Sequence, residues 1–242
     1  MKITKMTSIV AALFATLPMI SHAQTATFTG SGLASLHYSG DPGDAQYVAA
    51  SGSDPAYAAL STPDSGLSGD SPAVQIKAAN FDFSQSVLGG LSATYSLFGS
   101  ATGPASTTPY WLTYVNDPTT GGFIGIVSFG GPTLDATSQI HTFFDYDSSA
   151  PVADQTTHWG ETLGQLESDA FGSTTYGQLG IHSMGVEIGN YDNGADVVPA
   201  TANISSMTIN VTPAPEPSTL VLAGLGGLFG LVSIRRFRGR NN

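Results

Sequence analysis

The chain has 242 residues, of which 18 are acidic and seven are basic, and it contains no cysteine. All the acidic residues but only one basic residue, Lys77, lie between residues 24 and 217. Binding to nucleic-acid phosphates needs clustered Lys and Arg, so this composition excludes nucleic acid as an expected partner. The absence of cysteine excludes disulfides, thiol catalysis and thiolate metal sites.

Residues 1–23 have the layout of a secretory signal peptide. Lys2 and Lys5 precede a short apolar segment, and Ser-His-Ala at residues 21–23 supplies small residues at a cleavage site. We expect a signal-peptide helix that is removed, so that the mature chain begins near Gln24. An uncleaved membrane anchor is the alternative, but the apolar run is short and is interrupted by Pro18.

Residues 24–211 are predicted to form one extracellular β-domain. Short apolar segments alternate with Gly-, Pro-, Asn- and Asp-rich turns, a pattern typical of all-β proteins. The simplest architecture is a two-sheet, jelly-roll-like β-sandwich with one short helix, and a β-barrel is the alternative. We expect strands at residues 25–38, 73–83, 91–98, 110–115, 123–129, 139–146, 180–188 and 204–211.

Two segments depart from the strand pattern. Residues 40–72 contain Asp-Pro, Ser-Gly and Thr-Pro pairs and few large apolar residues, which predicts a long flexible loop region, with room for a short strand around Tyr47. In the second segment, Leu163, Leu166 and Ala170 are spaced for one face of a helix. We therefore expect one or two helical turns there.

The C-terminal end reads as a membrane-retention signal in three parts. Residues 212–218 form a Pro-rich linker, which we expect to be extended. Residues 219–234 are uncharged and predict a single transmembrane helix, although it would span only about 24 Å of a hydrocarbon core of about 30 Å. The basic tail, residues 235–242, is predicted to stay cytoplasmic, with the domain outside. Its orienting residues are Arg235, Arg236, Arg238 and Arg240.

This tripartite order resembles the PEP-CTERM sorting signal of Gram-negative bacteria. The resemblance is carried by Pro215-Glu216-Pro217, the Gly- and Leu-rich segment and the arginine cluster; Ala214 stands where the family usually has valine. It implies that the export machinery and exosortase are partners, and that exosortase recognises Pro215, Glu216 and Pro217. The protein would be held at the membrane by its C-terminal helix before processing and then reach the cell surface or extracellular matrix.

One loop contains the residue types of a calcium site. Asn190, Asp192, Asn193 and Asp196 place four oxygen-bearing side chains close together after a predicted strand. Calcium takes six to eight oxygen ligands, which such loops supply locally. Asx turns explain the same residues without a metal. The sequence therefore predicts calcium as the only candidate cofactor, with a plain turn as the alternative.

A sugar-binding surface is predicted from aromatic and acidic residues. Trp159 and Tyr191 flank predicted loops and are the better candidates for stacking on a sugar ring, ahead of Tyr110 and Tyr176. Asp145 and Asp147 are two apart at a strand end and so point the same way. Trp111, within an apolar run, is expected in the core.

No catalytic motif is apparent. His37, His141, His158 and His182 are scattered without metal-ligand spacing, and no nucleophile elbow or phosphate-binding loop occurs. The domain is loosely similar to lectin-like β-sandwiches, a likeness of fold that does not fix function. We therefore expect a non-enzymatic surface or matrix protein that binds polysaccharide. The alternatives are a carbohydrate-active hydrolase of jelly-roll fold and a purely structural matrix component.

Overall fold

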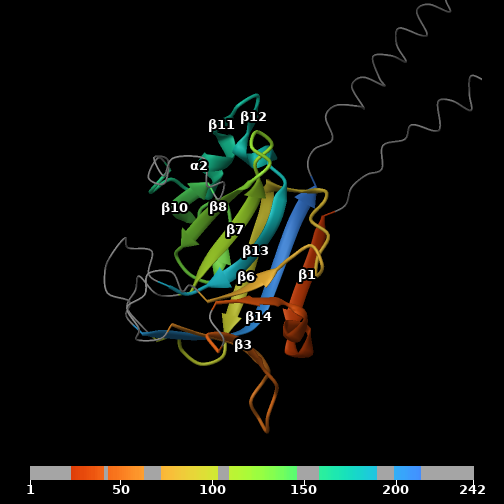
Figure 1. Ribbon diagram of the computed structural model, residues 1–242, viewed down its shortest axis with the longest axis vertical. Coiled ribbons are helices and arrows are strands. Elements are labelled where there is room, and N and C mark those ends of the chain that lie inside the picture. Colours follow the sequence, from red (N-terminus) through yellow and green to blue (C-terminus); the bar gives the residue numbers. More distant parts are fainter. Residues whose placement is uncertain are drawn as a thin grey trace, which may run out of the picture. The chain divides into compact units, whose positions relative to one another are not determined.

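The computed structural model describes residues 23–40, 43–62, 72–102, 109–145, 158–189 and 199–213. They all belong to one compact unit, Ala23–Ala214. Strands arranged in antiparallel sheets dominate this unit, and helix is confined to short segments (Figure 1). The all-β prediction is confirmed. The signal peptide, the transmembrane helix and the basic tail that the sequence predicts lie outside the described residues.

The first six-stranded sheet is organised around β14, a long strand that contacts three others. Over residues 204–213 it pairs with β6, while on its other side it pairs with β4 and then β1. The sheet order is β3-β4-β14-β6-β9, with β1 also on β14. Its strands are β1 (Gln24–Thr29), β3 (Ala45–Val48), β4 (Tyr57–Thr62), β6 (Ser86–Leu97), β9 (Thr133–Leu134) and β14 (Ala200–Pro213).

The second six-stranded sheet has the order β10-β8-β7-β13-β5-β2. Its middle strand pair, β7 and β13, aligns Gly185 with Leu112, and on the far side Gly185 faces Gln75 of β5. A Cβ atom at Gly185 would lie 2.5 Å from the Val74 carbonyl oxygen, so this close approach requires glycine. The strands are β2 (His37–Ser39), β5 (Ala73–Ile76), β7 (Tyr110–Asn116), β8 (Phe123–Phe129), β10 (Gln139–Asp145) and β13 (Ile181–Glu187).

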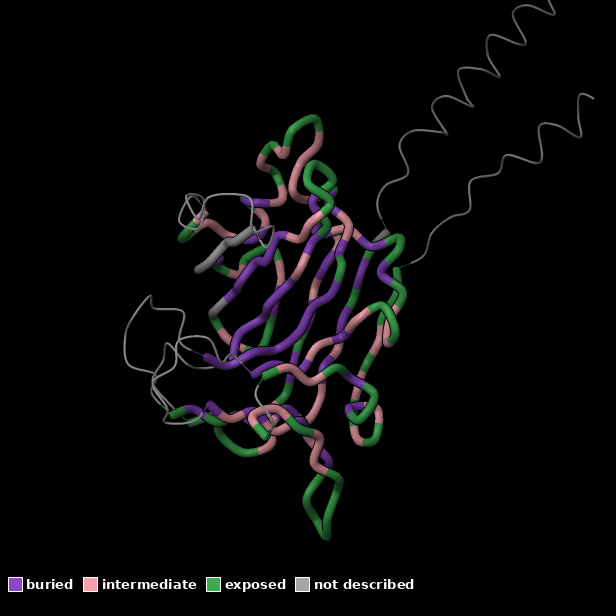
Figure 2. The backbone as a smooth tube through the Cα atoms, viewed as in Figure 1, coloured by how far each residue is buried: buried purple, intermediate pink, exposed green. Residues whose placement is uncertain are grey.

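The two sheets enclose a common hydrophobic core. Val74 and Val186 from the second sheet belong to the same buried cluster as Ile204 and Met207 from the first. Figure 2 shows that buried residues follow the strands and that exposed residues gather in the connections between them. Trp111 is buried as predicted, and its indole N–H donates a hydrogen bond to the Pro132 carbonyl oxygen at 3.1 Å. The domain is therefore a two-layer β-sandwich.

The segment predicted as one strand over residues 25–38 is divided between the sheets. β1 ends at Thr29, a 3-10 helix (η1, Gly30–Ser35) follows, and β2 begins at His37 in the other sheet. Gly30 has a positive φ of 53°, a backbone conformation that glycine adopts without steric cost. Leu33 is fully buried, so the 3-10 turn adds an apolar anchor to the core while it reverses the chain.

Residues 40–72 contain two strands where the sequence predicts a long loop with room for one. β3 includes Tyr47, as anticipated, but β4 was not expected. Along β4 the side chains alternate between half-buried and buried, and Ala58, Leu60 and Thr62 face inward. Alanine and threonine are small, so this inward face lacks the large apolar residues that signal a strand.

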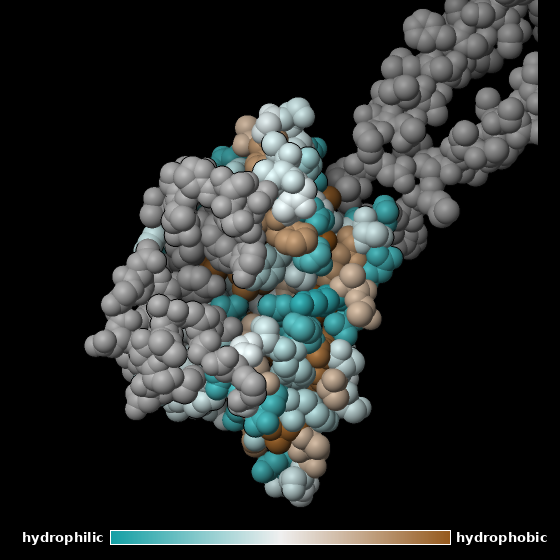
Figure 3. All heavy atoms as spheres, viewed as in Figure 1, coloured by the Kyte–Doolittle hydropathy of each residue, from teal (hydrophilic) through white to brown (hydrophobic). Residues whose placement is uncertain are grey.

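A short helix, α2 (Leu163–Ser168), occupies part of the segment predicted to be helical. It is followed by a small hairpin of β11 (Ala170–Phe171) and β12 (Thr174–Thr175) and by a 3-10 turn, η4 (Tyr176–Gln178). In Figure 1 these elements lie at one end of the sandwich, away from β3. On the face seen in Figure 3, the described residues are mainly polar or neutral, and apolar residues occur in small separate groups.

Candidate functional site

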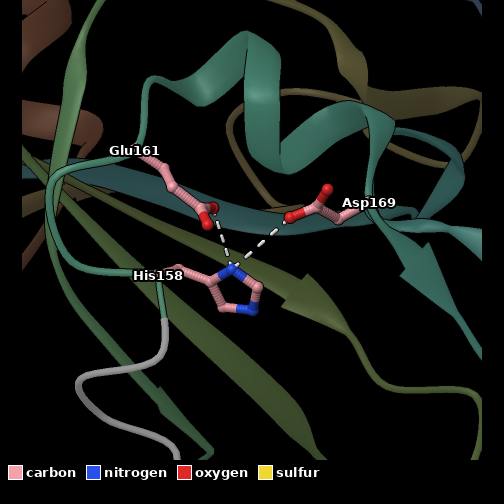
Figure 4. A group of neighbouring side chains, drawn as sticks. All are labelled: His158, Glu161 and Asp169. Carbon is pink, nitrogen blue, oxygen red and sulfur yellow. Dashed lines mark hydrogen bonds and ion pairs between the residues drawn. The ribbon is translucent and has the colours of Figure 1, made fainter.

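Three side chains that can bind a cation meet beside α2: those of His158, Glu161 and Asp169. The Nδ1 atom of His158 lies 2.9 Å from Oε2 of Glu161 and 3.6 Å from Oδ2 of Asp169. All three atoms lie within 4.8 Å of one another. Figure 4 shows Nδ1 pointing toward both carboxylates while the second ring nitrogen faces away. We call these three residues the His158 cluster.

A tight turn at residues 158–160 fixes the first two members of the cluster. Gly160 has a φ of 85°, and its N–H donates to the Ile140 carbonyl oxygen at 2.9 Å. The Ile140 N–H in turn donates to the Glu161 carbonyl oxygen at 2.8 Å. These bonds attach the turn to β10, so the Glu161 backbone is held by the second sheet.

The third member is positioned by α2. Thr162 and Gln165 form a capping box, in which each side chain bonds the other residue's backbone N–H. Leu163 and Leu166 are fully buried and attach the helix to the core. Asp169 is the C-terminal capping residue, and its N–H donates to the Leu166 carbonyl oxygen at 3.0 Å. Two carboxylates on either side of one helix are thereby brought together.

The helix is also fitted closely against the turn before β10. Gly164 donates its N–H to the Ala136 carbonyl oxygen at 2.9 Å, and a Cβ atom at Gly164 would lie only 3.0 Å from that oxygen. Glycine is a weak helix former, yet Gly164 is the residue that lets the helix approach this turn. The structure gives a packing reason for it.

An aromatic ring lies beside His158. The Tyr176 ring meets the imidazole edge-on, with centroids 5.3 Å apart, and Phe171 packs on Tyr176 at 5.0 Å. Trp159, the next residue in the turn, is 58% exposed, and among the described residues it is the one large hydrophobic side chain that is exposed. The site therefore combines an imidazole, two carboxylates and an accessible indole.

Charge at the cluster is unbalanced. The side chains of His158, Glu161 and Asp169 are 13%, 32% and 46% exposed. His158 forms an ion pair with each of these two carboxylates. One imidazole therefore faces two acids. Nearby on α2, burial raises the pKa of Glu167.

The other histidines belong to the sheets. The His182 ring lies 3.9 Å from the Phe123 ring, and burial, together with the charge of Lys77, lowers the pKa of His182. The same two causes lower the pKa of His37, at the start of β2. Both histidines lie in strands of the second sheet. The side chain of His141 lies outside the described structure.

Sequence reasoning singled out Trp159 but not its charged neighbours. Of the other aromatic candidates, Tyr110 is fully buried, and its hydroxyl donates to Glu187 Oε1 at 2.9 Å, so it is not a surface residue. Tyr176 is half-buried beside His158. The backbone of Asp145 lies in β10 opposite Ile124. The remaining candidates lie outside the described residues: Asp147, Asn190, Tyr191, Asp192, Asn193 and Asp196.

A local signal for part of the cluster exists in the sequence. His158 and Glu161 are three residues apart, a spacing that a tight turn can bring onto one side. Asp169 carries no such signal, because it joins them only after the chain has passed through α2.

Comparison with known families bears on the C-terminal end of the chain. Residues 213–236 match the PEP-CTERM protein-sorting motif. The match begins at Pro213, the last residue of β14, so the sorting motif follows directly on the sandwich. The motif supports an exported protein that exosortase processes, with membrane-anchored sorting before processing.

No curated protein and no solved structure is significantly similar to the chain. Pro215, Glu216, Pro217 and the final arginines lie outside the described residues. Within the described ranges, the structure has no helix that is both long and apolar enough to cross a membrane.

Proposed function

We propose that the mature domain is a non-enzymatic protein of the cell surface or extracellular matrix that binds polysaccharide beside the His158 cluster. The observation that carries this proposal is the exposed indole of Trp159, in the same turn as His158. An exposed aromatic ring suits the apolar face of a sugar ring. The carboxylates of Glu161 and Asp169 can accept strong hydrogen bonds from sugar hydroxyls.

Delivery to that location starts from the two ends of the chain. The PEP-CTERM motif supports export and processing, and the layout of residues 1–23 supports entry through a cleaved signal peptide. After both cleavages the working protein is the acidic domain alone. Its excess of carboxylates favours solubility in an extracellular medium.

The spacing of the two carboxylates supports binding over glycoside hydrolysis. A hydrolase needs two carboxyl groups about 5–10 Å apart on either side of the scissile bond. In the His158 cluster the metal-ligand atoms lie within 4.8 Å, and both carboxylates contact the same imidazole nitrogen. Two acids that share one partner favour joint contact with one ligand over a position on either side of a sugar ring.

The sandwich is also proposed to be jelly-roll-like. The chain passes from one sheet to the other at β1–β2, β2–β3, β4–β5, β5–β6, β6–β7, β8–β9, β9–β10 and β13–β14. Repeated crossing between two antiparallel sheets is typical of jelly rolls.

The test uses protein recovered from the cell surface, which mass spectrometry should find beginning at or near Gln24. On a glycan array this protein should bind a defined polysaccharide. Trp159→Ala should weaken that binding about two- to tenfold, the range of one aromatic contact, while Trp159→Phe should restore part of it. Tyr57→Ala is the matched control and should bind normally. It removes a ring of β4 that stacks on the ring of Phe98.

Two results would overturn the proposal. Correctly folded and processed protein that binds no glycan would indicate a structural matrix component instead. Release of reducing ends, abolished by Glu161→Gln or Asp169→Asn, would indicate a hydrolase.

A further inference from the structure

We propose that the His158 cluster binds a divalent transition-metal ion, with Zn²⁺ as the best-fitting example. The ligand atoms would be Nδ1 of His158, Oε2 of Glu161 and Oδ2 of Asp169. This site does not depend on polysaccharide binding, and nothing in the sorting motif calls for it.

The distances suit a small cation. Zn²⁺ binds imidazole nitrogen and carboxylate oxygen at about 2.0–2.2 Å, so tetrahedral ligand atoms lie about 3.3–3.6 Å apart. The two distances from His158 Nδ1 are 2.9 and 3.6 Å, and the third pair is within 4.8 Å. The two carboxylates are partly exposed, which leaves them room to rotate toward an ion.

The charge of the site favours a cation. Two carboxylates converge on one imidazole, and the only lysine or arginine between residues 24 and 217 is Lys77. Lys77 follows β5, where its charge acts on His37 and His182. A divalent cation would neutralise both acids at once and would leave the imidazole as a neutral nitrogen ligand.

The ligands are held on rigid elements before any metal arrives. Glu161 is attached to β10 through Ile140, and Asp169 is attached to α2, which Leu163 and Leu166 anchor in the core. The Tyr176 ring lies edge-on to the imidazole and restricts its rotation. Partial exposure of all three side chains gives the ion a path from solvent and leaves room for water in the remaining coordination position (Figure 4).

The donor set also selects the kind of metal. Calcium and magnesium prefer oxygen-only sites with six or more ligands. One imidazole with two carboxylates is a set suited to Zn²⁺ and its neighbours in the first transition series. The residues and the donor set of this site therefore differ from those of the calcium loop predicted at residues 190–196.

Isothermal titration of the full chain, purified in mild detergent without a polyhistidine tag, tests the proposal. Zn²⁺ should bind with one-to-one stoichiometry, and Ca²⁺ at the same concentration should not displace it. Added Co²⁺ should give the visible absorption of a low-coordinate site with a nitrogen ligand. His158→Ala and Asp169→Asn should each weaken Zn²⁺ binding about tenfold or more. Mutation of a residue that only hydrogen-bonds a metal ligand already lowers metal affinity by about that factor.

His182→Ala is the matched control, because it removes an exposed histidine from β13 and should leave Zn²⁺ affinity unchanged. Asp169→Asn preserves the shape of a partly exposed side chain and so guards against loss of binding through misfolding. Wild-type protein that binds no Zn²⁺, or equal affinity in wild type, His158→Ala and Asp169→Asn, would overturn the site. Glycan binding that survives a chelator would leave the proposed function standing while the metal site is judged separately.

Discussion

Asp117 closes the turn between β7 and β8 with hydrogen bonds to its own carboxylate. Oδ1 accepts from the N–H groups of Thr119 and Thr120 at 2.7 and 3.4 Å, and Oδ2 accepts from the Thr120 hydroxyl at 2.9 Å. Burial opposes ionisation of this buried side chain, but the hydrogen bonds from Thr119 and Thr120 outweigh it and hold the pKa of Asp117 below its ordinary value of 3.8. One residue thus stabilises a hairpin in its charged form.

Asp117→Asn should lower stability at neutral pH by about 1–3 kcal/mol, because turn donors lose a charged acceptor. A carboxyl with a lowered pKa stabilises the fold above its ordinary pKa, and that contribution is lost as pH falls below 3.8 toward the lowered value. Wild type should therefore lose more stability than the variant on acidification below that pH. Urea unfolding at several pH values measures this.

Asp54→Asn, on an exposed turn, is the control for the charge change and should follow the wild-type pH dependence. If the free energies of unfolding of wild type and Asp117→Asn decreased equally as the pH was lowered, the Asp117 carboxylate would not have the role described.

At the scale of elements, α2 is a short helix whose stability depends on its cap and on its buried side chains. Six residues are too few for a helix to persist on intrinsic propensity, so it rests on two buried leucines and a capping box. The helix also sets the separation of Glu161 from Asp169. Its stability and the geometry of the His158 cluster are therefore coupled.

Thr162→Ala should cost about 0.5–2 kcal/mol, because the cap that satisfies the Gln165 N–H is lost. It should also weaken ligand binding at the His158 cluster, since Asp169 is held by the helix. Thermal unfolding gives the first quantity and Zn²⁺ titration the second.

Ser168→Ala provides the comparison within the same helix. The Ser168 hydroxyl donates to the Gly164 carbonyl oxygen at 3.1 Å, a bond within the helix that adds little. This variant should be near wild type in both measurements. A Thr162→Ala protein indistinguishable from it would show that the capping box is dispensable.

Strands with large apolar residues could be predicted from the sequence, and strands with small ones could not. β8 matches its predicted range, residues 123–129, because Phe and Ile mark it clearly. β4 was missed because Ala58 and Thr62 form much of its buried face. In β10 the pairing register with β8 shifts between Ile140 and Thr142, an irregularity that residue spacing along the chain does not reveal.

The candidate site could be predicted only in part, because one of its residues joins the others only through tertiary structure. Trp159 stands out in any sequence of this composition, and His158 lies three residues before Glu161. Asp169 reaches them through the capping of α2 and the burial of two leucines in the core. Such a contact depends on tertiary structure, which residue spacing along the chain does not encode.

At the scale of the whole molecule, the first and last strands of the sandwich are neighbours. β1 pairs with β14 so that Gln24 aligns with Val211, and β14 also joins β4 and β6. The first sheet therefore depends on its C-terminal strand. The compact unit ends at Ala214, immediately after it.

A chain of residues 23–214 should fold and unfold cooperatively in urea, because it contains every strand of both sheets. A chain of residues 23–199 lacks β14 and should fail to give a cooperative transition, since β1, β4 and β6 lose their common partner. Circular dichroism and resistance to protease compare the two. A stable, protease-resistant shorter chain would contradict the central position given to β14.

The position of β14 sets an order of events during export. A chain that crosses a membrane from its N-terminus delivers β1 first and β14 last, so β1 must wait beside incomplete partners until nearly the whole domain has emerged. The sorting motif begins where β14 ends. In a chain that emerges N-terminus first, the sandwich cannot be completed until the residues that adjoin the sorting motif have emerged.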